Sequence, residues 1–308
     1  MIDEKRATAM ARLLYWLHII YSSFQGYAEV WQKLAGPWSG DCNNSFGAIA
    51  IHPTNSNIIY IGSSHPTNGY GIYKSVNAGS TWTSINNGLI QFTFTGYYPA
   101  ISKIVIALSN PNILYIGTYT DDPLFGSNGR IYRSIDGGNT WTDARGQCDL
   151  FSCEIQNGVL DLAVDPINSS SVIAGLGIQG VYKTTNGGGS WTKVISSTAA
   201  IGTTDFFNTL SISPSNRNIV YASGFRGYAF STLPCSFIVG ECVPINGVLP
   251  LGPFKSTDGG NNWTIINNPT PLSLTDLAAL ITYLGVRSSN DKVVLCFHSS
   301  LCVSDIYN

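Results

Sequence analysis

Five tryptophans recur along the chain at long and similar intervals, and four of them end the same nine-residue phrase. The tryptophans are Trp31, Trp82, Trp141, Trp191 and Trp263, separated by 51, 59, 50 and 72 residues. The four phrases are Lys74–Trp82, Arg133–Trp141, Lys183–Trp191 and Lys255–Trp263. Periods of this length are typical of repeat architectures. The chain is therefore expected to fold as several similar units, and this pattern says much more about fold than about function.

Each phrase joins two strand-like runs, as Ile72–Lys74 and Trp82–Ile85 flank the first one. All four contain Asp or Asn, whose side chain accepts hydrogen bonds from the backbone of its own turn, and three of them carry a Gly-Gly pair that permits positive φ. The phrases are therefore predicted to be hairpin turns. The tryptophan at the end is expected to lie under its hairpin and cover the apolar face.

Two further strand signals precede each phrase. The inner ones are 48–51, 104–108, 160–164 and 210–212, and the second ones are 58–62, 113–117, 172–175 and 219–222. A turn rich in Pro, Asn and Ser separates the two in every unit. Four short strands per repeat at this period predict the blades of a β-propeller.

The repeated phrase resembles the Asp-box, or BNR repeat, of sialidase-like propellers, sortilin-type receptors and xyloglucanase-type glycoside hydrolases. The shared pattern is Ser/Thr-x-Asp/Asn-x-Gly-x-Ser/Thr-Trp, from which Ala78 and Asn262 depart. The resemblance implies an all-β propeller whose boxes are structural turns away from the ligand face. It therefore implies no chemistry for the four phrases themselves.

A fifth unit begins at 276–280, continues through 292–297 and 301–304, and stops before its fourth strand. Val30–Leu34 carries Trp31 and is predicted to supply that strand, because pairing the two ends removes both open sheet edges. The sequence thus predicts a closed five-bladed propeller over residues 29–308. An open part of a six- or seven-bladed ring is the alternative.

Residues 1–28 differ from the repeats and form a separate region. Charged residues precede the apolar run Leu13–Tyr21, which predicts a short helix. Three interpretations stay open: an uncleaved signal or membrane anchor, a helix docked on a partner, or a helix packed on the propeller. The apolar run is shorter than the roughly 20 residues that a membrane span needs.

Composition indicates the compartment and the kinds of partner to expect for this protein. The net charge is −2 and 11% of residues are charged, so nothing favours a nucleic-acid partner. Six of the seven cysteines form close sequence pairs, which suits disulfides in an oxidising compartment. The pairs are Cys148/Cys153, Cys235/Cys242 and Cys296/Cys302, with Cys42 left over. The protein is expected to be extracellular or at the cell surface; six unrelated buried thiols are the alternative.

The long connections between units are predicted to share one face, because in this architecture the loops between second and third strands lie beside the chain's approach to each inner strand. They are 86–100, 118–129, 143–158, 195–208, 224–252 and 265–275. Aromatic residues are frequent there and are the candidate ligand-binding residues, since exposed rings stack on sugars or anchor proteins. They are Phe92, Phe94, Tyr97, Tyr98, Tyr119, Phe206 and Phe207.

Two aspartates, Asp161 and Asp276, each precede Leu-Ala near the start of a predicted inner strand. A pair of carboxylates across a channel is what glycoside hydrolysis requires. The resemblance weakens an enzymatic interpretation, because the chain lacks the Arg-Ile-Pro phrase of sialidases and has one ring where xyloglucanase-type enzymes place two aspartates between two propellers. The four histidines are scattered and no cofactor or metal site is indicated.

The sequence therefore favours a non-enzymatic propeller outside the cytoplasm that binds a protein or glycan partner through the long-loop face. The N-terminal helix would contact a membrane or another subunit. A glycoside hydrolase using Asp161 and Asp276 is the alternative function. A third hypothesis, by resemblance to propeller factors of photosystem assembly, is an assembly chaperone.

Overall fold

The computed structural model of the 308-residue chain describes residues 36–37, 46–63, 70–91, 96–119, 129–147, 155, 158–196, 203–228, 249–266, 281–286, 293–297 and 301–303. The chain divides into two compact units, Met1–Ala35 and Gly36–Asn308. All secondary structure reported below belongs to the second unit. The predicted N-terminal helix and the predicted closing strand Val30–Leu34 lie outside the described residues.

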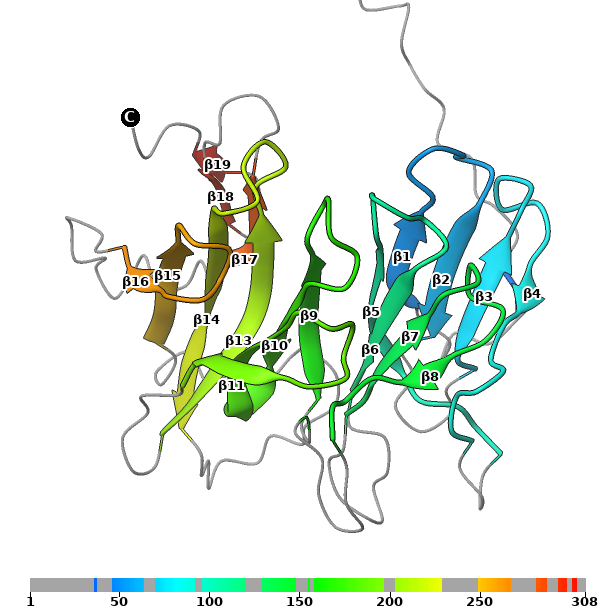
Figure 1. Cartoon of the computed structure of the whole chain (residues 1–308), viewed down its shortest axis with the longest axis horizontal. Coiled ribbons are helices and arrows are strands. Elements are labelled where there is room, and N and C mark those ends of the chain that lie inside the picture. The colour runs from blue at the N-terminus through cyan, green and yellow to red at the C-terminus, as the bar shows by residue number, and fades with distance from the viewer. Residues whose placement is uncertain are drawn as a thin grey trace, which may run out of the picture. The chain divides into compact units, whose positions relative to one another are not determined.

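Antiparallel sheets make up the described fold, and consecutive strands pair with one another (Figure 1). Blade 1 comprises β1 (Phe46–Ile51), β2 (Ile59–Ser63), β3 (Ile72–Ser75) and β4 (Thr83–Ser84). Blade 2 comprises β5 (Ile101–Ile106), β6 (Leu114–Thr118), β7 (Ile131–Ser134) and β8 (Thr142–Asp143). Blade 3 comprises β9 (Val159–Val164), β10 (Val172–Leu176), β11 (Gly180–Thr184) and β12 (Thr192–Ile195). Blade 4 comprises β13 (Thr203–Ile212), β14 (Val220–Tyr228), β15 (Leu249–Ser256) and β16 (Thr264–Ile265).

The last sheet has three described strands, β17 (Ile281–Val286), β18 (Val293–Phe297) and β19 (Leu301–Val303). The prediction of four-stranded blades is confirmed for the first four units. The inner strand of the last sheet is displaced from its predicted position, because the structure pairs Ile281–Val286 with β18. The predicted run 276–280 lies outside the described residues. Both segments are apolar, and the local pattern alone did not distinguish them.

Blade 4 is longer than predicted at its loop-side end. Residues 203–208 and 224–228 were expected to be loop, but they extend β13 and β14, with Thr203 opposite Tyr228. The first residues of β15, from Leu249, continue this ladder by pairing with β14. The run Thr-Thr-Asp-Phe-Phe is rich in β-branched and aromatic residues, which suits a strand.

One short 3₁₀ turn, Gly177–Gln179, is the helical element among the described residues. None of the residues that the structure describes forms a helix long and apolar enough to cross a membrane.

The four repeated phrases are hairpin turns, as predicted, between the third and fourth strands of their blades. In the second phrase, the Ser134 hydroxyl donates to Asp136 Oδ1 at 2.7 Å and accepts the N–H of Gly138 at 2.8 Å. The N–H of Thr140 donates to the same carboxylate at 2.9 Å. The other three turns repeat this pattern with Asn77, Asn186 and Asp258 at the acceptor position. These interactions define the repeat turns.

Blades pack through close approaches at glycine positions on second strands. A Cβ added at Gly62 would lie 2.4 Å from Ile101 Cβ, and one at Gly117 would lie 2.8 Å from Val159 Cβ. At Gly175 the added atom would lie 2.6 Å from the Phe207 carbonyl oxygen. Each contacted residue belongs to the inner strand of the following blade. Only glycine lets these strands approach so closely.

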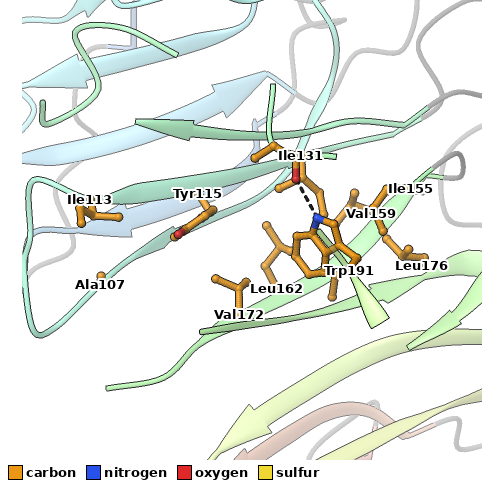
Figure 2. Packing of buried hydrophobic residues seen from close by; sticks show 12 residues of the cluster. Ala107, Ile113, Tyr115, Ile131, Ile155, Val159, Leu162, Val172, Leu176 and Trp191 are labelled. Atoms are coloured by element: carbon orange, nitrogen blue, oxygen red, sulfur yellow. Dashed lines mark hydrogen bonds between the residues drawn. The ribbon is translucent and has the colours of Figure 1, made fainter. Parts of the chain in front are cut away.

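Two repeat tryptophans connect neighbouring blades, which differs from the prediction that each covers its own hairpin. Trp141 Nε1 donates to the Ile85 carbonyl at 2.8 Å, and Trp191 Nε1 donates to the Ala144 carbonyl at 2.8 Å. Figure 2 shows Trp191 packed among core residues of blades 2 and 3. Trp263 instead donates to Gly260 in its own turn at 3.1 Å. The indoles of Trp141 and Trp191 lie next to the outer strands of the preceding blades, β4 and β8 respectively. These outer strands have two residues each, so the indoles fill the space beside them.

The repeat turns with aspartate predict an acid-dependent loss of stability. Hydrogen bonds from Asn262 and Ser256 hold the pKa of Asp258 well below its usual range. For Asp136, slight burial raises the pKa, but bonds from Thr140 and Ser134 outweigh it and the net shift is downward. A carboxyl with a depressed folded-state pKa stabilises the fold above the unfolded value of about 3.9, and this contribution is lost as pH falls through the folded pKa.

We therefore expect the double variant Asp136→Asn/Asp258→Asn to be less stable than the parent at pH 7 and to approach it below about pH 3. Asparagine already serves at Asn77 and Asn186, so the turn geometry should survive. Thermal unfolding midpoints of both proteins between pH 7 and 2.5 provide the measurement. A stability difference that stays constant over this range would contradict the assignment.

Candidate functional site

Every inner strand carries a β-bulge, at the second residue of β1, β5, β9 and β17 and in the middle of the longer β13. The residues that the pairing registers leave without a partner are Gly47, Ser102, Leu160, Asn208 and Thr282. Bulges redirect side chains and are frequent next to active sites. The candidate site therefore lies at this loop-side end of the inner strands, where Asp161 and several candidate aromatic residues are found.

Asp161 on β9 connects three blades. Lys103 Nζ on β5 lies 2.7 Å from Asp161 Oδ1, which also accepts the N–H of Leu162 at 2.9 Å. The other oxygen, Oδ2, accepts the N–H of Leu210 on β13 at 2.7 Å. Asp161 is 5% exposed, so its carboxylate is surrounded by these partners. Asp161 therefore links β9 to β5 through an ion pair and to β13 through a hydrogen bond.

Burial and hydrogen bonding act on Asp161 in opposite directions. Loss of solvent raises the pKa of its carboxyl above the usual value, while Lys103 and the N–H groups of Leu210 and Leu162 act to lower it. The side chain of Lys103 is 40% exposed, so the ammonium has partial access to water. A general base must reach the proton that it removes. In this arrangement both oxygens of Asp161 are already engaged by the protein.

Asp276, the second candidate acid, lies outside the described residues. The register shows which residue occupies the position of Asp161 in the last sheet. Asp161 pairs with Gly175, and the corresponding pair in the last sheet is Tyr283 with Cys296. The structure thus places tyrosine, and not aspartate, in register with Asp161. The inner strand of the last sheet begins at Ile281, later than the Asp276-Leu-Ala segment, and the pairing of Asp276 with Asp161 stays a prediction.

A cluster of tyrosines lies near the junction of blades 1 and 2 on the loop side. The rings of Tyr70 and Tyr97 meet edge to face, with centroids 6.4 Å apart. Tyr98 packs against the core cluster between these blades. Tyr119 follows β6, is 37% exposed, and its N–H donates to the Ala100 carbonyl at 3.1 Å. Partial burial raises the pKa of Tyr119, so its phenol is neutral at physiological pH.

The other candidate aromatic residues are placed differently. Phe206 lies on β13 opposite Phe225 and is half-buried. Phe207 is 1% exposed and its ring lies 5.7 Å from that of Phe254 in the core, so it has no exposed surface for a ligand. Phe92 and Phe94 lie outside the described residues.

Of the six paired cysteines, Cys296 and Cys302 fall within the described strands. The register places them directly opposite each other on β18 and β19. Opposed residues of antiparallel strands have Cα atoms about 4.5–5.5 Å apart, which a disulfide can span. Cys42, Cys148, Cys153, Cys235 and Cys242 lie outside the described residues. Within the part of the chain that the structure describes, no cluster of three or more His, Cys, Asp or Glu could hold a metal ion.

Sequence reasoning missed Lys103 and Tyr70. Lys103 occupies the same register position on β5 as Asp161 on β9, because each follows the bulge and pairs with a glycine of the second strand. A cation and a carboxylate at matching positions of consecutive repeats could have indicated the ion pair. Tyr70 precedes β3, and no local pattern connected it with Tyr97.

Comparison with known proteins finds similarity to a xyloglucanase. The chain is 31% identical over 158 residues to a xyloglucanase from Hypocrea jecorina (strain QM6a); the match covers 49% of this chain and 18% of that enzyme. No protein-family model matches the chain.

Solved structures with the same fold include an ancestral GH74 enzyme, with a TM-score of 0.54 and 20% identity, covering 85% of this chain and 30% of that one. The GH74 xyloglucanase from Xanthomonas campestris has a TM-score of 0.53 and 16% identity, covering 80% of this chain and 34% of that one. The chain thus has the β-propeller fold and spans about a third or less of the length of each of these three proteins.

Proposed function

We propose that this chain is a polysaccharide-directed propeller of the xyloglucanase type, whose substrate is xyloglucan or a closely related glycan. The observation that carries the proposal is the 31% identity over 158 residues to a xyloglucanase, in a chain that has a propeller fold. This similarity to a xyloglucanase favours the glycoside hydrolase, the alternative predicted from the sequence, over a non-enzymatic binding protein. A polymeric plant glycan also agrees with the proposed location outside the cytoplasm.

The tyrosine cluster is the proposed sugar-binding surface. The side chains of Tyr97 and Tyr119 are partly exposed. Their backbone segments lie side by side at the loop-side end of β5 and β6, where the N–H of Tyr119 donates to the Ala100 carbonyl. Aromatic faces and phenol hydroxyls suit a ligand with one apolar ring face and many hydroxyl groups. Tyr70 would hold Tyr97 in place through their edge-to-face contact. Phe206 on blade 4 is a separate proposed contact for the glycan.

Hydrolysis requires two carboxyl groups, about 5–5.5 Å apart in retaining enzymes or about 6.5–9.5 Å apart in inverting ones. We keep Asp276 as one of the two proposed carboxyl groups, and cleavage would require it to act with a carboxyl group other than that of Asp161. Asp161, with both oxygens engaged, is proposed as a positioning residue that fixes β9 between β5 and β13. Polysaccharide binding without cleavage is the second candidate function, and the engagement of Asp161 is the observation that favours it.

Incubation of the full chain with xyloglucan tests both functions. We expect retention of the protein in xyloglucan-containing native gels and release of reducing ends, with starch as the control polymer. Tyr97→Ala and Tyr119→Ala should each weaken retention about tenfold, the loss of an anchoring contact of roughly 1.4 kcal/mol. Ile135→Ala, on a repeat turn and 65% exposed, is the matched control and should bind normally.

The results separate the two functions. Reducing-end release that disappears in Asp276→Asn supports hydrolysis by this chain. Retention without release supports binding alone. Equal behaviour with xyloglucan and starch, or no retention at all, would reject the glycan proposal.

The proposed location outside the cytoplasm has its own measurement. We expect Cys296 and Cys302 to be disulfide-bonded in protein produced through a secretory route, since their strands place them opposite each other. Peptide mapping without reduction would detect this link. Both thiols alkylated in the native protein would count against it.

A further inference from the structure

The sequence contains six Asn-Gly pairs, and the structure describes both residues of two of them, Asn87-Gly88 and Asn186-Gly187. An asparagine side chain can react with the backbone nitrogen that follows it. Glycine leaves that nitrogen open to close approach because it has no Cβ. Which of the two pairs reacts therefore depends on how the fold holds each one.

The reaction needs only water as a partner. The glycine nitrogen attacks Cγ of the asparagine, the Cγ–Nδ2 bond breaks, and the displaced nitrogen takes the glycine proton and leaves as ammonia. Water then adds to one of the two carbonyl carbons of the resulting succinimide ring and opens it. Opening at one carbonyl gives aspartate. Opening at the other gives isoaspartate, in which the main chain runs through Cβ and Cγ.

The reacting groups of Asn87-Gly88 are accessible in the folded chain. The two residues form the centre of a β-turn, in which the N–H of Leu89 donates to the Asn86 carbonyl at 2.9 Å and Gly88 has a φ of 93°. Both residues are exposed. Within the described part of the chain, neither the Asn87 side chain nor the Gly88 N–H has a hydrogen-bond partner. Cγ and the glycine nitrogen can therefore meet without breaking a hydrogen bond to any described residue.

The second pair is held by the repeat turn that contains it. Asn186 Oδ1 accepts the N–H of Ser190 at 2.9 Å and the hydroxyl of Thr184 at 2.8 Å, while Nδ2 donates to Ser190 Oγ at 2.9 Å. Gly187 is buried, and its N–H donates to the Ser170 carbonyl at 2.8 Å. The Asn186 side chain is itself exposed, so access to solvent does not distinguish the two pairs. The difference lies in the hydrogen bonds that must break.

We propose that Asn87 is a site of spontaneous deamidation and that its conversion to isoaspartate opens the contact between blades 1 and 2. The Asn87 carbonyl accepts the backbone N–H of Trp141 at 2.9 Å, and the Ile85 carbonyl accepts its Nε1 at 2.8 Å. The segment thus holds both the backbone and the indole of Trp141.

The turn has no room for a longer main chain. Gly88 lies so close to blade 2 that an added Cβ would collide with the Trp141 carbonyl oxygen. Isoaspartate inserts one extra atom into the main chain between the Asn87 Cα and the Gly88 nitrogen. The turn cannot accept that atom while Gly88 and the Asn87 carbonyl both keep their places against Trp141. Ordinary aspartate leaves the main chain unchanged and adds only an exposed charge.

Peptide mapping of the full chain after storage at mildly alkaline pH tests the chemistry. Methylation by an isoaspartate methyltransferase identifies the isoaspartate peptides. We expect position 87 to convert at least about tenfold faster than position 186, because several hydrogen bonds must break before Asn186 reacts. In urea the two rates should become similar. Equal rates in the folded protein would overturn the proposal, as would a difference that persists in the unfolded chain.

Thermal unfolding tests the structural consequence. Stored parent protein should contain a population whose unfolding midpoint is lower by about 5 °C or more, in proportion to the isoaspartate at position 87. Stored Asn87→Gln is the control, since it keeps every other Asn-Gly pair and should lack this population. Fresh Asn87→Asp should unfold within about 2 °C of the parent, because it carries the charge without the longer main chain. Isoaspartate-containing protein that unfolds together with the parent would refute the proposed effect on the blade contact.

Discussion

Replacing Trp141 by alanine should destabilise the protein by about 3–5 kcal/mol, the usual cost of removing a buried large aromatic side chain. The indole is 3% exposed and lies in the cluster that joins blades 1 and 2. Its loss would leave a cavity beside Tyr60 and Ile85 and remove the hydrogen bond to the Ile85 carbonyl. Urea unfolding with an unchanged slope measures the loss of stability.

Trp263 is the matched comparison for this prediction. It stands at the same position of its repeat turn, but it is half-buried and its indole bonds to its own turn. Trp263→Ala should therefore cost clearly less than Trp141→Ala. Trp141→Phe should fall between them, since it keeps an aromatic ring but leaves a buried carbonyl without its donor, at about 1–3 kcal/mol. Similar losses at positions 141 and 263 would show that the indole acts within its own hairpin.

Removing the Asp161 carboxylate should also cost about 3–5 kcal/mol, as expected when one partner of a buried ion pair is deleted. In Asp161→Ala the N–H of Leu210 loses its acceptor and the Lys103 ammonium loses its counter-charge. The inner strands β5, β9 and β13 would lose the ion pair and the hydrogen bond that link them. Because Lys103 is 40% exposed, its ammonium can turn to water, which places the effect in the lower half of the range.

An ion pair between blades 3 and 4 whose arginine is exposed serves as the control for Asp161. Arg217 Nη1 lies 3.3 Å from Asp165 Oδ2, and the Arg217 side chain is 46% exposed. Arg217→Ala should change stability by less than about 1 kcal/mol, as is usual for surface pairs. Asp161→Asn should retain most of the stability of the parent, because the amide oxygen still accepts a backbone N–H. If Asp161→Asn folds normally but abolishes cleavage of xyloglucan, the positioning role is wrong and Asp161 takes part in the chemistry.

The two aspartates illustrate why the site was harder to predict than the turns. The hydrogen bonds of a repeat turn join residues two to four positions apart, so Ser134, Asp136 and Thr140 carry the necessary information in one phrase. The partners of Asp161 come from strands 58 residues before and 49 residues after it in the chain. No local pattern specifies such contacts, and the apparent match between Asp161 and Asp276 relied on a strand that begins five residues later.

The sequence by itself determined the all-β class, the four-strand repeat, and the place and chemistry of its turns, because short-range hydrogen bonds and strand alternation depend on neighbouring residues. Tertiary structure decided which carboxylate is buried and which tryptophans join blades. Those properties depend on the registers between strands and on the distances between blades. The physical reason is that burial and pairing are set by segments about 50 residues apart, whose approach only the folded chain defines.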